Sequence, residues 1–387
     1  MSSSHEFDVV VVGAGLVGAS FALALRGCGL KIAVVEPAPL QQPENDWDSR
    51  IYALSPASVT FLRQLGAWQR LDAGRIQRVE RMEIHGDQAG AKLQFSAYEA
   101  GAEALAYILE SNRLQYALGE ALRDSDAEFF CPVRGAHFDA AAKSLELSDG
   151  RILRSELFVG ADGANSWLRQ AAKIEASRQP YEQRGVVANF ECTESHLATA
   201  FQWFRKDGVL ALLPLPGGRA SMVWSTPDAH AETLMQLDAA ALTKRVEEAA
   251  GSRLGQMKPL SSPQAFPLQL LRAETCVAPG VALIGDAAHV VHPLAGQGVN
   301  LGFGDAEVLA RVLSGREAGR ACGDHGLLRR YERQRAEPIA AMRGVTHGLQ
   351  RLFAAPGRLP AFLRNTGLNL SERSPVLKTW LIRNALG

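Results

Sequence analysis

The spacing of apolar residues changes several times along the chain. Residues 7–12 and 31–35 are short, nearly continuous apolar runs rich in β-branched residues, which is typical of strands buried on both faces. Residues 16–26, between them, have helical character. The three segments predict a β-α-β unit. Residues 157–160 and 281–284 repeat the short apolar pattern, so we expect the first domain to contain segments far apart in the sequence.

Two other stretches alternate between apolar and polar residues. They are residues 78–95 and much of 185–224, the second punctuated by Pro and Gly in LLPLPGGRA. Such alternation predicts a mostly antiparallel sheet with one covered face. Beyond residue 337, the pattern predicts helices interrupted by Pro356, Pro360 and Pro375.

These patterns predict an α/β protein with a Rossmann-like domain and a second domain built on the antiparallel sheet. We assign residues 1–75, 101–177 and 272–340 to the discontinuous Rossmann-like domain. Residues 76–100 and 178–271 form the sheet domain, and residues 341–387 form a C-terminal helical segment.

Composition excludes several classes of protein. The 387 residues are 47% hydrophobic and only 21% charged, so the chain can bury a large core. The 41 basic and 41 acidic residues give no net charge that would attract nucleic acid. The five cysteines form no C-x-x-C pair, which favours a reducing compartment and no structural metal. No signal peptide or membrane span is evident, so we expect a cytoplasmic protein.

The first candidate site is the turn after residue 12, in VVVGAGLVGASFA. Gly13 allows a tight turn, Gly15 lets a pyrophosphate approach the backbone, and Gly18 allows close packing of helix on strand. Glu36 ends the second strand, where its carboxylate can accept hydrogen bonds from ribose hydroxyls. This combination predicts a dinucleotide site.

Two further turns follow short apolar strands. In LFVGADGANSWLR, Asp162 belongs either to the nucleotide site or to a capped turn that opens a helix. In GVALIGDAAHVVHPLAGQGVNLGFGD, Gly285 and Asp286 end a strand, and Gly298 opens a helix whose N-terminus offers free N–H groups. His289 and His292 lack a third nearby ligand, so we do not interpret them as a metal site.

The order of these motifs resembles the class A FAD-dependent aromatic monooxygenases of the p-hydroxybenzoate hydroxylase fold. The block HPLAGQGVNLGFGD is most similar to the signature of the ubiquinone-biosynthesis hydroxylase family. The segments SRIYALSPASVTFLRQLG and LLPLPGGRASMVW extend the resemblance, which covers most of the chain up to about residue 340.

The resemblance implies that FAD spans the distant turns, with its ADP half on the first and its isoalloxazine half on the last. Pro293, Gly296 and Gln297 would frame the cavity in which oxygen reacts. The cofactor-binding residues that it implies are Gly13, Gly15, Gly18, Glu36, Arg50, Gln115, Asp162, Gly285, Asp286, Gly298, Val299 and Asn300. The chain departs from the family pattern at LESNRLQYAL, where Ser111 takes a position commonly held by Asn or Arg.

The implied reaction is hydroxylation of the aromatic ring of a polyprenylated phenol in ubiquinone biosynthesis. NADPH or NADH would reduce FAD, and O2 would form a flavin C4a-hydroperoxide. One alternative is a hydroxylase of a small soluble phenol, which predicts a carboxylate-binding arginine in the sheet domain, for which Arg184, Arg205 and Arg219 are candidates. Another is a non-catalytic flavoprotein that assembles with other quinone-biosynthesis proteins.

The C-terminal segment differs in charge from the rest of the chain. Residues 341–387 contain seven basic residues and one acidic residue, a local charge of +6, interleaved with Leu, Phe and Trp. This pattern fits a basic amphipathic surface in peripheral contact with the inner face of the membrane. It also fits a helix packed on the core with a solvated basic face. A bilayer-resident substrate favours membrane contact.

Overall fold

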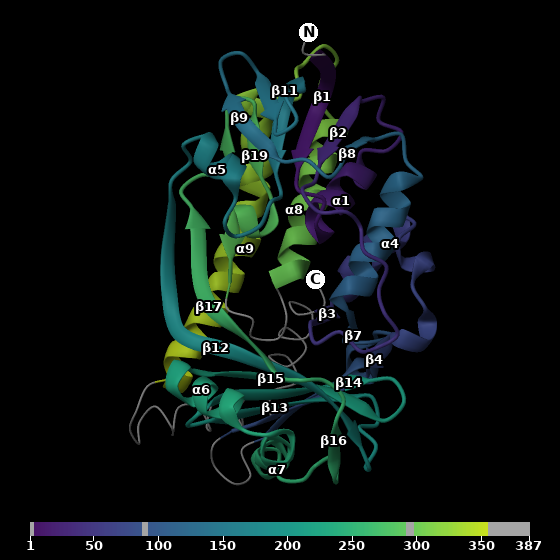
Figure 1. The fold of residues 1–387 in the computed structure, drawn as a ribbon, viewed down its shortest axis with the longest axis vertical. Coiled ribbons are helices and arrows are strands. Elements are labelled where there is room, and N and C mark those ends of the chain that lie inside the picture. Colours follow the sequence, from purple (N-terminus) through teal and green to yellow (C-terminus); the bar gives the residue numbers. More distant parts are fainter. Residues whose placement is uncertain (1–3, 87–91, 292–297, 355–387) are drawn as a thin grey trace.

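The computed structural model describes residues 4–86, 92–291 and 298–354. Within these ranges the chain forms two large sheets and one small one, with an upper part around the first sheet and a lower part around the second (Figure 1). The strands β12 (Ala176–Cys192) and β17 (Gln264–Ala273) run from the lower sheet up beside the first one (Figure 1).

The first sheet has a parallel core. Its order is β18-β19-β11-β1-β2-β8, and β9 and β10 extend it from β11. The strands are β1 (Ser4–Val12), β2 (Ile32–Val35), β8 (Glu128–Phe130), β9 (Gly135–Asp139), β10 (Ser144–Leu147), β11 (Ile152–Gly160), β18 (Val277–Ala278) and β19 (Val281–Leu283).

Burial on both faces explains the continuous apolar runs. Val9 and Val11 of β1 belong to the core under helices α1 and α8, whereas Val10 and Val12 pack in a second core with Phe158. Consecutive side chains of a strand point to opposite faces, so a strand between two cores needs apolar residues at every position. The predicted β-α-β unit is present as β1, α1 and β2.

The second sheet is mostly antiparallel, as expected from the alternating segments. Its order is β20-β17-β12-β15-β14-β13-β5-β6, with β16 paired to β12. The remaining strands are β5 (Arg81–His85), β6 (Lys92–Ser96), β13 (Thr199–Arg205), β14 (Gly208–Leu215), β15 (Arg219–Pro227), β16 (Met257–Pro259) and β20 (His289–Val290). A small sheet joins β3 (Ile51–Leu54), β7 (Ala106–Glu110) and β4 (Gln77–Val79).

Helices cover the first sheet and the outer face of the second (Figure 1). They are α1 (Leu16–Ala24), α2 (Pro56–Gln64), α3 (Ala97–Ala100), α4 (Ser111–Arg123), α5 (Trp167–Ala171), α6 (Asp228–Gln236), α7 (Ala239–Ala249), α8 (Gly298–Ser314) and α9 (His325–Ala354). Short 3-10 turns occur at Trp68–Arg70, Ala73–Arg75 and Gly285–Ala287.

The sequence-based domain boundaries cut through some of these elements. Helix α9 runs continuously across residue 340 with Pro338 inside it, and β20 pairs with β17 of the second sheet although it follows residue 272. Pro356, Pro360 and Pro375 lie outside the described residues. No described helix combines the length and the apolar character that a membrane crossing requires.

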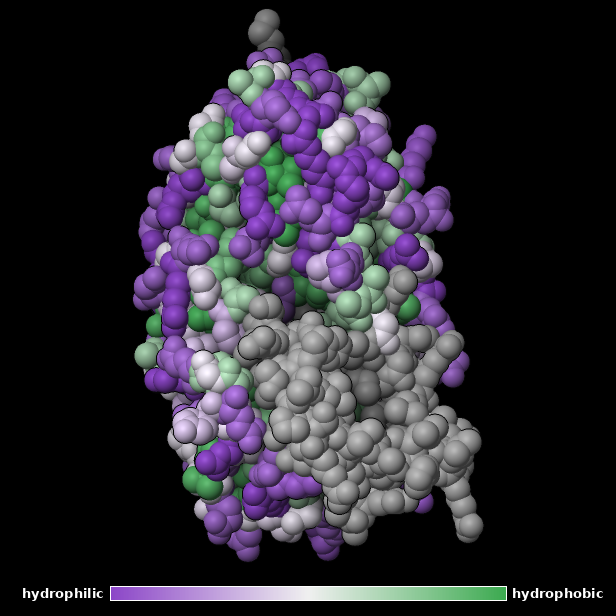
Figure 2. Space-filling model, turned by 180° about the vertical axis from the view of Figure 1, so that it is seen from behind, coloured by the Kyte–Doolittle hydropathy of each residue, from purple (hydrophilic) through white to green (hydrophobic). Residues whose placement is uncertain are grey.

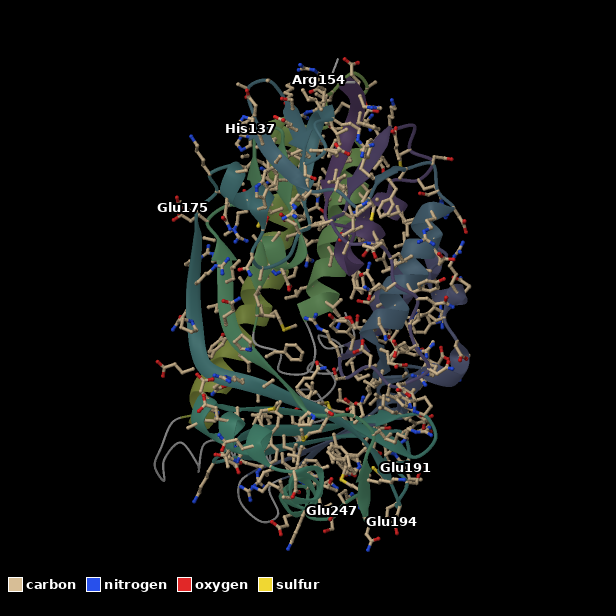
Figure 3. The ribbon with its side chains drawn as sticks, in the orientation of Figure 1. His137, Arg154, Glu175, Glu191, Glu194 and Glu247 are labelled. Carbon is tan, nitrogen blue, oxygen red and sulfur yellow. The ribbon has the colours of Figure 1, made fainter. Side chains whose placement is uncertain are left out.

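On the face seen from behind, polar side chains dominate the part of the surface that is not covered by residues outside the described ranges (Figure 2). Seen from behind, the upper part carries mainly hydrophilic side chains, with apolar residues visible in the recesses between them (Figure 2). Labelled charged side chains such as Arg154 and Glu247 lie at the two outer ends of the molecule (Figure 3).

Candidate functional site

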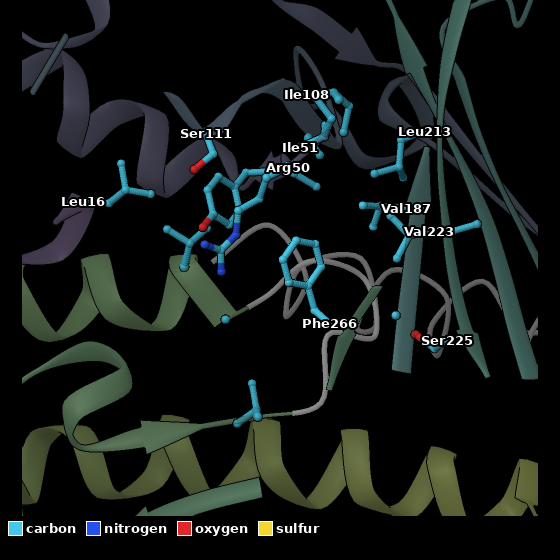
Figure 4. Close-up of a pocket in the computed structure, with 18 of the residues that line it drawn as sticks. Leu16, Arg50, Ile51, Ile108, Ser111, Val187, Leu213, Val223, Ser225 and Phe266 are labelled. Atoms are coloured by element: carbon cyan, nitrogen blue, oxygen red, sulfur yellow. The ribbon is translucent and has the colours of Figure 1, made fainter. Parts of the chain in front are cut away.

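A cavity of about 700 Å³ lies between the first turn and the second sheet. On one side it is lined by Gly15, Asp286 and Gly298, and on the other by aliphatic side chains such as Val187 and Val223 (Figure 4). Its size is in the range of small-molecule and cofactor sites. Of the described residues that line it, only Arg50 and Asp286 are charged.

The three glycines of the first turn meet different surroundings. A Cβ at Gly13, where φ is +101°, would lie 2.6 Å from the carbonyl oxygen of Ala161, and one at Gly18 would lie 2.0 Å from that of Gly13. A Cβ at Gly15 would meet no protein atom within 4 Å, because Gly15 faces the cavity. Packing thus explains Gly13 and Gly18, whereas the missing side chain at Gly15 leaves space beside the N-terminus of α1 for a ligand.

Two side chains hold the peptide at Ala14 in place. Glu36 accepts a hydrogen bond from the backbone N–H of Ala14 at 2.7 Å and one from that of Ala38 at 3.1 Å. Gln115 donates to the carbonyl oxygen of Ala14 at 2.7 Å. Gln115 also lines the cavity. Both residues therefore shape the backbone to which a pyrophosphate would bind.

Asp162 caps a helix. Its Oδ2 accepts hydrogen bonds from the backbone N–H groups of Trp167 at 2.7 Å and Leu168 at 3.1 Å, at the start of α5. It does not line the cavity, although its neighbours Ala161 and Gly163 do. These contacts match the capped turn that the sequence left open as an alternative.

The third turn brings two loops together. Asn300, in the first turn of α8, accepts hydrogen bonds from Ser55 N–H at 3.0 Å and Ser58 Oγ at 2.8 Å, and donates to Ala53 at 2.9 Å. Gly298 and Val299 line the cavity, whereas Asn300 fixes the helix N-terminus to the segment after β3. Pro293, Gly296 and Gln297 lie outside the described residues.

A buried charge network supports this turn, and sequence reasoning missed it. Asp305 Oδ2 accepts from Gly285 N–H at 2.9 Å and pairs with His289 Nε2 at 2.7 Å, while Arg335 Nε donates to Oδ1 at 2.6 Å. Asp305 has no exposed surface, and Arg335 and His289 are also buried. The aspartate in the quoted block was visible in the sequence, but nothing there marked its partners.

The network shifts the ionisation of its members. Burial opposes the charge on Asp305, yet His289 and Arg335 hold its pKa below the usual range. Burial likewise opposes protonation of His289, but Asp305 raises the pKa of that ring above its ordinary value. Asp286 lies deep in the molecule but is open to the cavity. Burial raises the pKa of its carboxyl group above the ordinary value, although the nearby charges of His289 and Arg50 oppose this shift. The turn thus combines the buried charges of Asp305, His289 and Arg335 with the carboxyl group of Asp286, which faces the cavity.

Arg50 lies at the cavity wall. Its guanidinium carbon is 5.9 Å from the ring centroids of both Tyr52 and Phe266 (Figure 4). Ser111 N–H donates to its carbonyl oxygen at 2.9 Å, and Ser111 itself lines the cavity. By contrast, Arg113 is paired with Glu110 at 2.9 Å and does not line the cavity.

The three arginines considered as carboxylate ligands are engaged elsewhere. Arg184 pairs with Asp228 and Glu232, Arg205 pairs with Asp207, and Arg219 donates to the carbonyl oxygen of Pro216. None of them lines the cavity. Within the described part of the chain, no group of three His, Cys, Asp or Glu residues is placed to hold a metal ion.

The open space at Gly15, joined by one cavity to a largely apolar sheet face, is typical of dinucleotide-binding proteins. The family model described as FAD binding domain matches residues 6–344. The chain is 37% identical to the 3-demethoxyubiquinol 3-hydroxylase of Escherichia coli, with 100% of both chains covered. It is 32% identical to the mitochondrial ubiquinone biosynthesis monooxygenase of Drosophila melanogaster, covering 100% of this chain and 91% of that protein.

Solved structures show the same fold. Pseudomonas aeruginosa PqsL, described as a probable FAD-dependent monooxygenase, is 25% identical and has a TM-score of 0.78, covering 94% of this chain and 100% of that one. A single-residue variant of Klebsiella pneumoniae HpxO complexed with FAD shares the fold at 19% identity, with a TM-score of 0.76 and 98% of each chain covered. The chain therefore belongs to the family of FAD-dependent monooxygenases that includes the ubiquinone-biosynthesis hydroxylases.

Proposed function

We propose that this protein uses FAD, NADPH or NADH, and O2 to hydroxylate the aromatic ring of a polyprenylated phenol in ubiquinone biosynthesis. The observation that carries the proposal is the single cavity that connects Gly15 and Gly298 with the aliphatic face of the second sheet. A prenylated ring is apolar apart from its oxygen substituents, and an aliphatic wall suits it. The identity to the two ubiquinone-biosynthesis relatives supports the same substrate class.

The residues present fit FAD. The open space at Gly15 and the N-terminus of α1 suit the pyrophosphate. Glu36 follows β2, and its carboxylate, which already accepts a hydrogen bond from the Ala14 N–H, would also accept hydrogen bonds from the ribose hydroxyls. Asp286 faces the cavity with its carboxyl. The cofactor supplies the redox and oxygen chemistry when bound, while this chain binds, orients and shields the reactants.

The start of α8 has a distinct part in this proposal. Its first N–H groups have no partners within the helix, and the helix dipole adds a partial positive charge there. Reduced flavin carries negative charge on its pyrimidine edge, so Gly298, Val299 and Asn300 would stabilise that state. Gly285 and the Asp305 network would hold this end of the helix beside Asp286.

Pro293, Gly296 and Gln297 remain proposed walls of the oxygen cavity. We also retain the proposed division into a discontinuous FAD-binding domain and a sheet domain.

The arginine positions weigh against a small carboxylated phenol as substrate. Such a substrate needs a basic partner next to the aliphatic wall, and Arg184, Arg205 and Arg219 all point their guanidinium groups to other partners. Arg50 is the only basic residue among the described residues lining the cavity, and its guanidinium carbon lies 5.9 Å from the ring centroids of Tyr52 and Phe266.

The test is hydroxylation by the purified, FAD-loaded protein. We expect a geranylated phenol to stimulate NAD(P)H oxidation and to yield a product that is heavier by one oxygen atom in mass spectrometry. When the reaction is run under isotopically labelled O2, the added oxygen atom should carry the label. Stimulation by p-hydroxybenzoate alone would favour the small-phenol hydroxylase. FAD binding without any phenol-dependent oxidation would favour a non-catalytic partner.

We further propose that the C-terminal segment attaches the protein to the inner face of the membrane, close to its bilayer substrate. Residues 355–387 lie outside the described residues, so this proposal rests on the charge of +6 and the interleaved apolar residues in 341–387. Anionic lipid contributes on the order of 1 kcal/mol per nearby basic residue. Attachment of this kind weakens as salt screens the charges.

A further inference from the structure

On strands β12 to β15 of the second sheet, the described residues that line the cavity are apolar or glycine with two polar exceptions. Gln269 on the neighbouring strand β17 also lines the cavity, but it is only half-buried. Strands β12 to β15 direct Val187, Ala200, Val209, Ala211, Leu213 and Val223 into the cavity. The exceptions are Gln202 on β13 and Ser225 on β15. Each retains only 6% of its accessible surface, and both line the cavity; Figure 4 shows Ser225 beside Val223.

Neither side chain has a hydrogen-bond partner within the described protein. Their backbones are engaged in the sheet, where Gln202 is in register with Ala211, and Ser225 with Gly185 and Val209. Ser55, a third strongly buried polar residue of the cavity wall, instead bonds to Ser58. An amide or hydroxyl withdrawn from bulk water without a partner is costly, so a ligand that supplies the partner gains that energy.

The register places the two groups at opposite sides of an apolar floor. Ala211 faces Val223 across the β14–β15 pair, and Val223 faces Val187. Gln202 and Ser225 lie on strands that are two strand spacings apart, so about 10 Å separates the backbones of these strands. The polar groups at the ends of the two side chains can lie closer together than that. Next to Ser225, Gly185 has no side chain; it is in register with Phe266 of β17, and a Cβ there would lie 3.6 Å from Leu268 Cδ2.

This spacing suits an aromatic ring with oxygen substituents on two sides. We propose that Gln202 and Ser225 hydrogen-bond oxygen substituents of the substrate ring and thereby determine which ring carbon faces the flavin. The inference rests on the proposed function and adds a specificity determinant to it. An aliphatic floor alone does not distinguish one rotation of a flat ring from another, whereas two fixed polar groups do. Both side chains donate and accept, so they suit hydroxyl, methoxy and carbonyl oxygens.

The test compares two ligands that differ only in ring oxygens. FAD-loaded wild type, Gln202→Leu and Ser225→Ala are titrated with a geranylated methoxyphenol and with geranylbenzene, and binding is followed by the change in flavin absorbance. We expect each substitution to weaken binding of the methoxyphenol by about 2- to 12-fold, the usual net effect of a neutral hydrogen bond. Binding of geranylbenzene stays equal or becomes tighter, because an unpaired polar group has been removed.

Ser221→Ala is the matched control. Ser221 lies on the same strand as Ser225 and has an unpartnered hydroxyl, but it is fully buried and does not line the cavity. The Ser221→Ala substitution should leave the affinities for the geranylated methoxyphenol and for geranylbenzene unchanged. If Gln202→Leu fails to retain FAD, Gln202→Met, which preserves the length of the side chain, takes its place.

Product analysis gives a second readout. Loss of one anchor lets the ring rotate, so we expect Gln202→Leu or Ser225→Ala to yield a mixture of ring positions or more hydrogen peroxide per NAD(P)H. Equal losses for both ligands would indicate a packing effect and overturn the proposal, as would wild-type affinities and a wild-type product in both variants. A wild-type protein that neither responds to the methoxyphenol nor hydroxylates it would instead contradict the proposed function.

Discussion

The glycines of the first turn allow cofactor binding to be separated from folding. Gly15 is the N-cap of α1 with φ −63° and ψ −177°, a conformation open to any residue, and a Cβ there meets no protein atom within 4 Å. Serine is a favoured N-cap because its hydroxyl accepts from an N–H of the first turn. Gly15→Ser should therefore leave the apoprotein as stable as wild type, or more stable by roughly a few tenths of a kcal/mol.

The same side chain should obstruct FAD. It occupies the space that lets a pyrophosphate reach the backbone, and each charge-assisted hydrogen bond lost there costs about 1.5–3 kcal/mol. At least a tenfold loss of FAD affinity follows, since about 1.4 kcal/mol corresponds to a factor of ten. Gly18→Ala is the opposite case: its Cβ would lie 2.0 Å from the Gly13 carbonyl oxygen. Overpacking of this kind costs about 1–3 kcal/mol in the apoprotein itself.

The assay measures FAD per protein by visible absorbance and the thermal midpoint of each apoprotein by circular dichroism. Gly15→Ser should lose FAD and keep its midpoint, whereas Gly18→Ala should lower the midpoint. Full FAD content in Gly15→Ser would refute the assignment of this space to the pyrophosphate. A lowered midpoint in Gly15→Ser would refute the claim that the space is not needed for folding.

Other predictions address the third turn and the tail. Asp286→Ala should weaken FAD binding to the apoprotein by about 1.5–3 kcal/mol in calorimetry, and an unchanged affinity would remove Asp286 from the site. Asp305→Ala leaves Arg335 and His289 buried without their partner, so urea unfolding should show a loss of about 3–5 kcal/mol; a loss below about 1 kcal/mol would contradict the network's role. The raised pKa of His289 means that its pairing stabilises the fold fully below pH 6.5 and is lost as pH rises through the folded-state value. The free energy of unfolding of the wild type should therefore decline as the pH rises from 6.5 through the pKa of His289 in the folded state, and it should decline less in His289→Gln. Parallel pH profiles of the two proteins would contradict a stabilising role for the protonated His289. Liposome flotation with anionic lipid should be salt-sensitive for the intact protein and weaker after truncation at residue 340, provided that the truncated form still binds FAD, and equal flotation of both forms would exclude residues 341–387 as the attachment.

A strand could be predicted from the sequence where the pattern of its own apolar and polar residues indicates strand structure. β1 and β2 were recognisable because burial on both faces requires apolar residues at every position. The first half of β12 gave no such signal: residues 176–184 are largely exposed and polar, and their strand conformation comes from pairing with β17. Similarly, β4 lies in an alternating segment but pairs with β7 in the small sheet, a choice that no local pattern encodes.

The candidate site divides in the same way. Gly15 and Gly298 could be located from the sequence because a ligand's approach to a helix N-terminus requires a small residue at a fixed place in the turn. The partners of Asp305 could not, since His289 and Arg335 come from different elements and a buried ion pair leaves no periodic pattern. For Asp162, both interpretations fit the sequence, and only the geometry shows the cap on α5.

The order of strands in the first sheet also bears on how the protein is made. β11 pairs with β1 on one side and β19 on the other, and β19 is synthesised about 120 residues after β11, which at roughly 5–20 residues per second is a delay on the order of 6–24 s. β10 already pairs with residues 152–154 of β11, so during that interval only residues 158–160 lack a partner strand on this edge, and such an edge is a template for association with other chains. Until α8 follows β19, the turn that faces the cavity does not exist, and a ribosome-bound chain has no complete place for the cofactor to bind. Chaperone occupancy on the translating ribosome should therefore end only after α8 has left the exit tunnel, and the arrival of FAD is confined to the last part of synthesis or to the time after release.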